Sequence, residues 1–281
     1  MIYSENASVQ ETSVTKGAKF FIGIMSGLLG GFFGGLLGLG GGIIMIPLMT
    51  WLAKMTQHQA HGTSLVAIVF TAIVGGTSYF LHGEVDWKVA VILAVSATIT
   101  ARFGARYAHS LPEKKLKMAF GFFLIFASTL LVVKGYLPKI NWTFGAWTSI
   151  IDFLMIGFIT GFVSGMMGVG GGGVMVPLMV ILGNIGQHMA QGTSLIAMIP
   201  ASTSGALTHH KLGNVKMDVA WGLIVGSLVG AYFGAATASQ LPDFHLKIAF
   251  AAVGVWMGMK YIKAGRAGKA GRAGEEVKSE K

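Results

Sequence analysis

The stretch "GLLGLGGGIIMIPLM" at residues 35–49 places three successive glycines and then a proline inside a long apolar segment. The stretch "GMMGVGGGGVMVPLM" at residues 165–179 repeats the pattern. Glycine and proline are both unfavourable inside a helix, glycine through backbone freedom and proline through its missing N–H. Two copies of such an interruption predict two broken helices at equivalent places in a duplicated chain.

The composition indicates a protein embedded in a lipid bilayer. Of 281 residues, 53% are hydrophobic and 11% are charged, with no cysteine to form a disulfide or a thiolate ligand. Mean hydropathy is +0.67, outside the usual range of a soluble domain. We therefore expect an all-α polytopic membrane protein without a removable signal peptide. Its apolar blocks lie at residues 20–53, 65–81, 89–101, 118–133, 150–182, 195–207, 219–238 and 248–259.

The chain consists of two related halves. Shifting the sequence by 130 residues aligns Pro47 with Pro177 and His58 with His188, and residues 31–68 match residues 161–198 at 20 of 38 positions. Such repeats are typical of secondary transporters. The predicted organisation is a polar N-terminal segment (1–18), a first membrane repeat (19–137), a linker (138–148), a second membrane repeat (149–263) and a basic, disordered tail (264–281).

Loop charges distinguish two arrangements of the halves. If each glycine break lets the chain turn back, each half has about five membrane segments and the halves are inverted repeats. Ten lysines and arginines then lie on the side of the N-terminus and four on the other side, before the tail is counted. A parallel repeat gives seven against seven. The positive-inside rule favours inversion, in the cell membrane, with both termini cytoplasmic. The basic tail fits a cytoplasmic anchor next to lipid better than a nucleic-acid partner.

The glycines predict an anion site built from helix ends. Gly40, Gly41 and Gly42 look like a break after which a new helix starts, with free N–H groups and the positive end of its dipole exposed. Gly170, Gly171 and Gly172 give the same prediction in the second half. Close helix packing is the alternative for these glycines and for the small-residue spacing from Gly23 to Gly35. The match to G-x-G-x-x-G at residues 168–173 follows no isolated strand, so dinucleotide binding is rejected.

A second predicted element, "QHQAHGTSL" at 57–65 and "QHMAQGTSL" at 187–195, follows each proline. Its hydroxyls have the chemistry of helix N-caps and can donate to oxyanions, although simple capping in a loop is the alternative. Histidine at the second position can bind the anion, carry a proton or serve structure. His209 and His210 are adjacent and lack further ligands, so a metal is not expected. The predicted substrate-binding set is Gly40, Gly41, Gly42, Gln57, His58, Thr63, Ser64, Gly170, Gly171, Gly172, Gln187, His188, Thr193 and Ser194, with Pro47 and Pro177 as helix breaks.

The doubled "GLGGGIIMIPLM" and "GVGGGGVMVPLM", the "HGTSL" and "QGTSL" elements, "GTSYFLHGEVDWKVA" and "LPEKKLKMAFGFFL" resemble the TauE/SafE-type (TSUP) family of sulfite and organosulfonate exporters. The resemblance runs from about Lys19 to Tyr261. It implies a cell-membrane transporter of sulfur-containing anions such as sulfite, sulfoacetate, thiosulfate or sulfonates. The family's motifs fall on Gly38, Gly40, Gly41, Gly42, Pro47, Gly62, Thr63 and Ser64, and again on Gly168, Gly170, Gly171, Gly172, Pro177, Gly192, Thr193 and Ser194. The halves differ at His61 against Gln191, Tyr79 against His209 and Arg102 against Tyr232.

The sequence therefore predicts a secondary transporter of small sulfur-containing anions that works by alternating access. An anion channel lined by the same helix ends is the alternative. The sequence shows no nucleophile and base in a catalytic arrangement and no metal cluster that would support an enzyme or receptor, so no enzyme activity and no cofactor are expected. The expected partners are a small anion and the bilayer, with proton or ion coupling through His58 and His188, and a homodimer left open.

Overall fold

The structure is a computed structural model that describes residues 16–133, 146–183, 185–238, 240, 248, 251–252, 254–256 and 258–265. The predicted N-terminal segment, linker and basic tail lie wholly or largely outside these residues. Their boundaries stay predictions.

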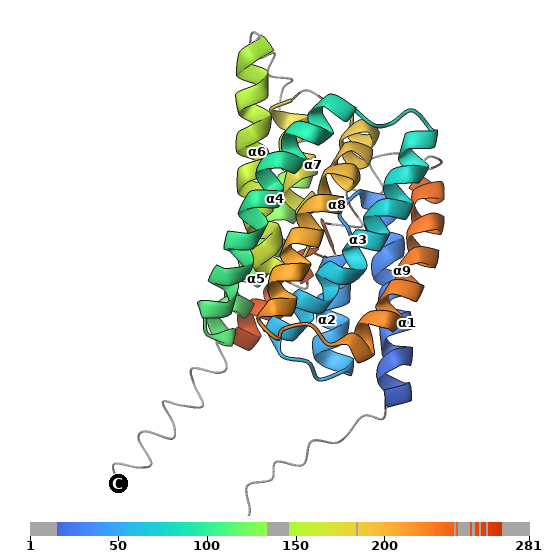
Figure 1. The fold of residues 1–281 in the computed structure, drawn as a ribbon, viewed down its shortest axis with the longest axis vertical. Helices are drawn as coiled ribbons and strands as arrows, with labels where there is room; N and C mark the ends of the chain where they lie inside the picture. The colour runs from blue at the N-terminus through green and yellow to red at the C-terminus, as the bar shows by residue number, and fades with distance from the viewer. Residues whose placement is uncertain are drawn as a thin grey trace, which may run out of the picture.

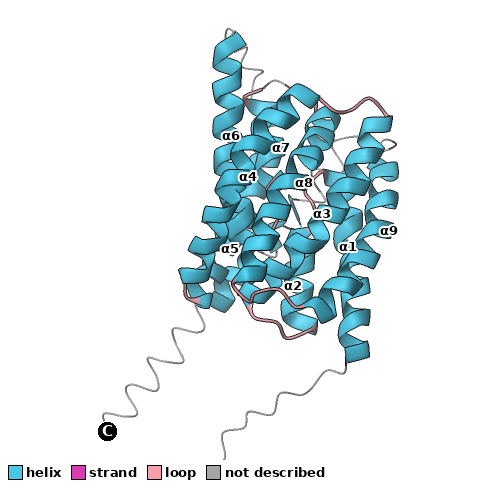
Figure 2. Cartoon of the chain, in the orientation of Figure 1, coloured by secondary structure: helices cyan, strands magenta, loops and turns pink. Residues whose placement is uncertain are grey.

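The regular structure of the described residues is helical, as the apolar blocks predict (Figure 2). Within the described residues, five helical stretches are long and apolar enough to cross a membrane, namely Gly17–Leu37, Gln57–Leu81, Trp87–Ser110, Ile150–Met167 and Met217–Ala238. Residues 258–265 are also helical. The prediction of an all-α polytopic membrane protein is confirmed. The helices are α1 (Lys16–Leu37), α2 (Gly42–Leu52), α3 (Gln57–Leu81), α4 (Trp87–Ser110), α5 (Glu113–Val133), α6 (Ala146–Met167), α7 (Gly172–Ile181), α8 (Gln187–Lys211) and α9 (Met217–Ala238).

Both long apolar blocks are interrupted at the glycines, as predicted. The first becomes α1 and the short α2, and the second becomes α6 and the short α7. After the first break the chain turns back along α1. The close approach of the two segments shows this, since a Cβ added at Gly30 of α1 would lie 3.1 Å from the carbonyl oxygen of Gly41. The prediction that the prolines break the helices is wrong. Pro47 and Pro177 lie inside α2 and α7, which continue past them.

The two halves of the sequence are intertwined. Figure 1 shows α1 beside α9 and α6 beside α4, so each half supplies the neighbour for the first helix of the other. The small-residue spacing of α1 serves this contact, since a Cβ at Gly23 would lie 2.6 Å from Val219 O and one at Gly31 would lie 2.6 Å from Ser227 O. Glycine lets the two backbones approach this closely. The packing interpretation of the Gly23 to Gly35 series is confirmed.

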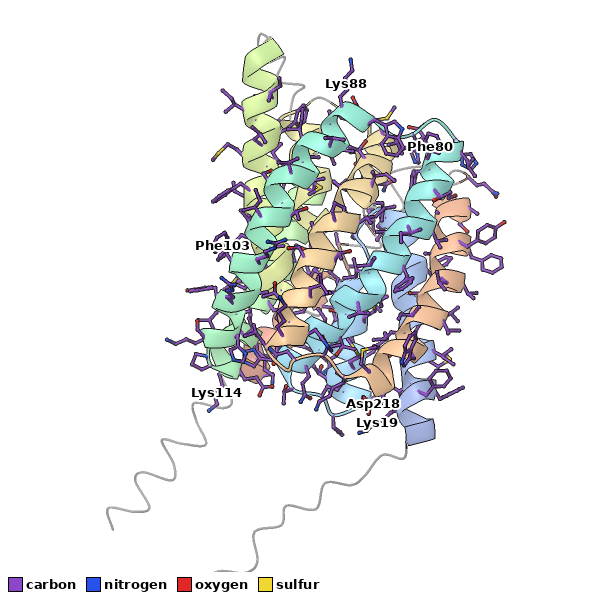
Figure 3. All side chains as sticks on the ribbon, in the orientation of Figure 1. Lys19, Phe80, Lys88, Phe103, Lys114 and Asp218 are labelled. Atoms are coloured by element: carbon purple, nitrogen blue, oxygen red, sulfur yellow. The ribbon has the colours of Figure 1, made fainter. Side chains whose placement is uncertain are left out.

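The ends of the bundle can be recognised from labelled side chains. Lys19, Lys114 and Asp218 lie at the end where α1 begins, and Lys88 lies at the opposite end (Figure 3). We call these the lower and upper ends, as Figure 1 orients them. In that view α1 starts at the lower end, whereas α6 starts at the upper end.

The outer surface of the bundle is apolar. On α4, Val91, Val95, Ile99 and Phe103 are each more than half exposed, and they recur at helical spacing on one face. A continuous apolar stripe on the outside of a helical bundle suits contact with lipid chains rather than with water. The polar side chains that are fully buried, by contrast, gather on α3 and α8.

Candidate functional site

Two glycine loops, residues 38–41 and 168–171, lie between the broken helices. Gly38, Gly40 and Gly41 have φ of 68°, 79° and 87°, and the equivalent loop has 66°, 90° and 87° at Gly168, Gly170 and Gly171. Residues with a Cβ rarely adopt these angles, so the loop backbone requires glycine. The break thus starts at Gly38 and ends at Gly41, and the predicted Gly42 and Gly172 are the first residues of α2 and α7.

The two loops contact each other through their backbones. A Cβ at Gly42 would lie 2.7 Å from Val169 Cα, and a Cβ at Gly172 would lie 2.8 Å from Leu39 Cα. The contact is reciprocal, since Gly42 and Gly172 are equivalent in the two halves. The breaks therefore form one joint feature in the interior of the bundle, where both loops are buried.

The starts of α2 and α7 carry buried amides without a protein acceptor in the described part of the chain. The amides of Ile44 and Met45 both donate to Gly41 O at 3.1 Å, but the amides of Gly42 and Ile43 have no acceptor among the described residues. Gly41, the N-cap, has no side chain to supply one. Gly171 has the same position before α7, where Val174 and Met175 donate back to it. Buried free N–H groups are rare in proteins, and a ligand oxygen would satisfy them.

The predicted serines hold the glycine loops in place. Ser64 Oγ of α3 lies 2.7 Å from Gly168 O, and Ser194 Oγ of α8 lies 2.8 Å from Gly38 O. Both side chains are fully buried. Each hydroxyl lies between a loop carbonyl of the other half and the carbonyl three residues before it in its own helix, at 2.8 Å in both cases, and shares its one hydrogen between these buried acceptors.

The prediction that Thr63, Ser64, Thr193 and Ser194 are helix N-caps is wrong. The N-cap of α3 is Thr56, which forms a capping box with Gln59, and the N-cap of α8 is Gly186. Thr63 and Thr193 lie in the second turn. There Thr63 Oγ1 accepts from Lys216 N at 3.0 Å and Thr193 Oγ1 accepts from Asp86 N at 2.9 Å. The threonines thus bind the segments that lead into α9 and α4.

The α3 N-terminus is occupied by a carboxylate of the protein itself. Glu113 Oε1 accepts from Gln57 N at 3.0 Å and lies 3.1 Å from Lys117 Nζ. An acidic group is favoured there because it faces free amides and the positive end of the helix dipole. The sequence prediction of an anion at this helix start is met by Glu113 rather than by a free site.

Gln57 and His61 form a buried pair at the lower end. Gln57 Nε2 lies 2.7 Å from His61 Nε2, and His61 Nδ1 lies 3.0 Å from Met166 O in the last turn of α6. Because a carbonyl only accepts, Nδ1 carries the hydrogen and Nε2 accepts from the amide of Gln57. Gln57 Oε1 has no hydrogen-bond partner in the described part of the chain. Both side chains are fully buried.

The structure does not bring His58 and His188 together. His58 lies at the lower end with its ring centroid 6.2 Å from that of His109. His188 lines a cavity of about 210 Å³ at the upper end, together with Tyr79, His82 and Glu84. Gln57 and Gln187 are separated in the same way, as first residues of α3 and α8. The predicted set therefore divides into a central group, made by the glycines and serines, and two flanking groups.

Two histidines outside the predicted binding set, His61 and His209, cap the end of α6. His61 contacts Met166 O, and His209 Nε2 lies 2.9 Å from Gly165 O. Asn214 Nδ2 lies 3.4 Å from His209 Nδ1 and 3.1 Å from His109 Nδ1, which continues the group toward the surface. The mismatch of these positions with Gln191 and Tyr79 was the available signal. Their joint position at one helix end is a tertiary feature.

Intertwined helices, an apolar exterior and two apposed broken helices define a polytopic membrane protein of the transporter class. The chain matches the family described as "Sulfite exporter TauE/SafE" over residues 22–261 and belongs to that family. It is a membrane transporter of the TauE/SafE type.

The relatives carry transporter names. The chain is 28% identical over 271 residues to YunE of Bacillus subtilis, covering 88% of this chain and 98% of the relative. It is 30% identical over 226 residues to a protein of Xylella fastidiosa, covering 79% and 86%. It is 25% identical over 257 residues to MJ0441 of Methanocaldococcus jannaschii, covering 84% and 92%. Each relative is named "Probable membrane transporter protein". No solved structure matches the chain.

Proposed function

We propose that this chain is a secondary transporter of small sulfur-containing anions such as sulfite, sulfoacetate, thiosulfate or organosulfonates, and that it leaves them chemically unchanged. The observation that carries the proposal is the pair of buried helix starts at Gly42 and Gly172. Their first amides have no acceptor in the described part of the chain, and they belong to loops that contact each other. Half-helix N-termini that meet inside a membrane protein are suited to bind an anion.

In this proposal the oxyanion is held by backbone amides of α2 and α7. Gly40, Gly41, Gly170 and Gly171 keep Cβ atoms away from the anion, and Ser64 and Ser194 fix the two loops at 2.7 and 2.8 Å. Thr63 and Thr193 act indirectly, through the segments that they bind. A site made of amides carries no fixed charge, which allows an anion to be released as well as bound.

We further propose that the halves are inverted repeats in the cell membrane, with the lower end in the cytoplasm. Two observations support this topology. In Figure 1, α1 and α6 run in opposite directions, and in Figure 3 Lys19 and Lys114 lie at the lower end. The positive-inside rule places such an end in the cytoplasm.

Alternating access would move units that do not coincide with the two halves of the sequence. Since α1 packs on α9 and α4 packs on α6, one unit combines α1 to α3 with α9, and the other combines α6 to α8 with α4. The contact of α3 with α8 lies between these units. Movement there would open the loops toward one end at a time.

Proton coupling, if it drives transport, is assigned to the lower end. His61 and His209 contact carbonyls at the end of α6, and a protonated imidazole has no acceptor nitrogen left for Gln57 or Asn214. The equivalent upper positions, Gln191 and Tyr79, cannot carry a proton in this way. The proton-carrying role of His58 and His188 stays a prediction beside this assignment.

The test is uptake of radiolabelled sulfite, thiosulfate and sulfoacetate into proteoliposomes, with acetate as control, with and without an imposed pH gradient. We expect one sulfur anion to accumulate above equilibrium and to be recovered unaltered. Flux of all the anions down their gradients would make the protein a channel, because a channel cannot concentrate its substrate. Absence of flux for every sulfur anion would overturn the proposal.

A further inference from the structure

A basic cavity of about 360 Å³ opens beside the lower end of the bundle. It lies between the last turns of α2, the first turns of α5 and helical residues 258–265. Lys117, Lys260 and Lys263 line it, together with Thr50, Trp51 and Tyr261. Three ammonium groups around one cavity indicate an anionic occupant.

The charges of this cavity are only partly compensated. Lys117 pairs with Glu113 at 3.1 Å, and the other ion pair found among the described residues, Lys19 with Asp218, lies elsewhere. Lys260 and Lys263 thus form no ion pair within that part of the chain. Because the cavity walls exclude part of the solvent, an anion there interacts with these charges more strongly than it would in bulk water.

Aromatic rings hold one of these lysines in position. Lys260 Nζ lies 4.4 Å from the ring centroid of Trp256 and 5.0 Å from that of Trp51. The negative faces of the two rings attract the ammonium group and restrict its movement. An ammonium group that is already positioned loses less conformational freedom when an anion binds.

The floor of the cavity leads toward the buried Gln57 and His61. Tyr261 is 4% exposed, and its hydroxyl lies 3.2 Å from Thr50 Oγ1. Since Thr50 donates its own hydrogen to Pro47 O at 2.9 Å, Tyr261 is the donor to Thr50. Behind Tyr261, the Phe120 ring lies 4.9 Å from the Tyr261 ring and 5.5 Å from the ring of His61. Tyr261 and Phe120 therefore separate the basic cavity from the interior.

We propose that the cavity of Lys117, Lys260 and Lys263 is a binding site for a small oxyanion, where the transported sulfur anion waits at the lower end, and that Tyr261 and Phe120 are the gate behind it. This assignment rests on the proposed function for the identity of the anion. The phosphate of a lipid headgroup has the same chemistry, and Trp51 and Trp256 would suit the membrane surface, so the experiment must separate the two sources.

The test uses the full chain in nanodiscs of phosphatidylcholine and measures binding of radiolabelled sulfite by equilibrium dialysis. The variants are Lys260→Gln, Lys263→Gln and the double variant. Lys88→Gln, at the upper end, is the matched control. Among the described residues, Lys263 makes no hydrogen bond, ion pair or ring contact, so Lys263→Gln should fold normally, which a thermal melt of each variant checks. We expect the double variant to weaken sulfite binding about tenfold and the control to change it less than about twofold.

A second arm adds an anionic phospholipid to the nanodiscs. If the site holds the solute, sulfite binding by the wild type persists and remains dependent on the lysines. Loss of sulfite binding on adding the lipid, with lipid retained by the wild type and not by the double variant in native mass spectrometry, would overturn the assignment to the solute.

The pocket and the proposed function can fail separately. Wild-type accumulation of sulfite together with binding that is equal in all variants would overturn the pocket and leave the function standing. Binding of sulfite that depends on the lysines, without accumulation of any sulfur anion, would support the pocket and overturn the function.

Discussion

At the end of α1, the carbonyl of Leu36 accepts from the Tyr79 hydroxyl at 3.3 Å, and the same hydroxyl lies 3.1 Å from Gln191 Oε1. At the end of α6, the equivalent carbonyl of Met166 lies 3.0 Å from His61 Nδ1, and His209 contacts its neighbour Gly165 O at 2.9 Å. Both helix ends stop at a glycine loop and leave carbonyls that need donors. The Tyr79 phenol is the donor at the end of α1, where the Gln191 amide oxygen is a second acceptor for the same hydroxyl, and two imidazoles are the donors at the end of α6.

The difference teaches that the backbone symmetry of the breaks does not extend to their chemistry. A phenol keeps its hydrogen throughout the physiological pH range, whereas an imidazole gains a second N–H when it is protonated. Protonation would leave the carbonyl contacts of His61 and His209 intact and would break the contacts in which their other nitrogen accepts. The Tyr79 contacts should therefore not respond to protons. The contacts of His61 and His209 would respond only in a state in which water reaches the two imidazoles, because both are fully buried here and burial disfavours the charged form.

The largest effect is expected from a bulky residue in either glycine loop. Gly41→Leu should abolish uptake while the protein still inserts in the membrane, because Gly41 has φ of 87° and its Cβ would meet the carbonyl of Gly30. Gly171→Leu should do the same. Alanine should affect the two loops differently. A Cβ at Gly171 would lie 3.1 Å from Thr160 O and has more room than one at Gly41, so Gly171→Ala should reduce uptake less than Gly41→Ala.

The control for this prediction is Gly83→Leu. Gly83 also has a positive φ, of 75°, but nothing lies within 4 Å of its added Cβ. We expect it to cost about 1 kcal/mol in stability and to leave uptake intact. Wild-type uptake by Gly41→Leu in proteoliposomes would show that the break is not needed.

A smaller effect is expected when His61 and His209, at the end of α6, are replaced by the residues found at the equivalent positions at the end of α1, Gln191 and Tyr79. The double variant His61→Gln and His209→Tyr should retain uptake down a concentration gradient and lose its response to an imposed pH gradient. Initial uptake rates at a series of external pH values measure this, with Tyr79→Phe as the control that alters the upper end only. A double variant that still responds to the pH gradient like the wild type would place the proton elsewhere.

The smallest effect is expected from the two serines. Ser64→Ala and Ser194→Ala each leave a buried loop carbonyl without its donor, at a cost of about 1–3 kcal/mol. Because Ser64 and Ser194 make equivalent bonds of 2.7 and 2.8 Å, both variants should lower the free energy of unfolding to a similar extent. Denaturation in detergent checks this, with the exposed Ser110→Ala as a control. A loss confined to one serine would mean that the loops are held differently.

The features that could be predicted from the sequence are those that depend on the residue types within one short segment. The apolar blocks predict the helices, and the contiguous glycines predict the breaks, because residues with a Cβ rarely adopt the positive φ that the breaks require. The small-residue spacing of α1 gave a packing face but not its partner α9. The inverted arrangement and the binding role of the predicted residues stay predictions.

The features that escaped prediction depend on distant contacts or on a misplaced helix start. Thr56 and Gln59 have the spacing of a capping box, which would have moved the start of α3 upstream of Thr63. No local pattern places Glu113 on the amide of Gln57. Lys260 and Lys263 share a helix face, but their cavity with Lys117 exists only after α2, α5 and residues 258–265 come together.

The pairing of α1 with α9 also constrains how the protein is made. The ribosome releases α1 first, and its partner, which begins at Met217, is among the later helices to be synthesised. Until then the glycine face of α1 lacks α9 and meets lipid or another helix. The first half alone lacks this partner, just as α6 would lack α4 if the second half were made alone. Assembly of the finished protein is therefore a late event in synthesis, and a ribosome that stops before α9 leaves a chain in which the glycine face of α1 lacks the helix that it fits.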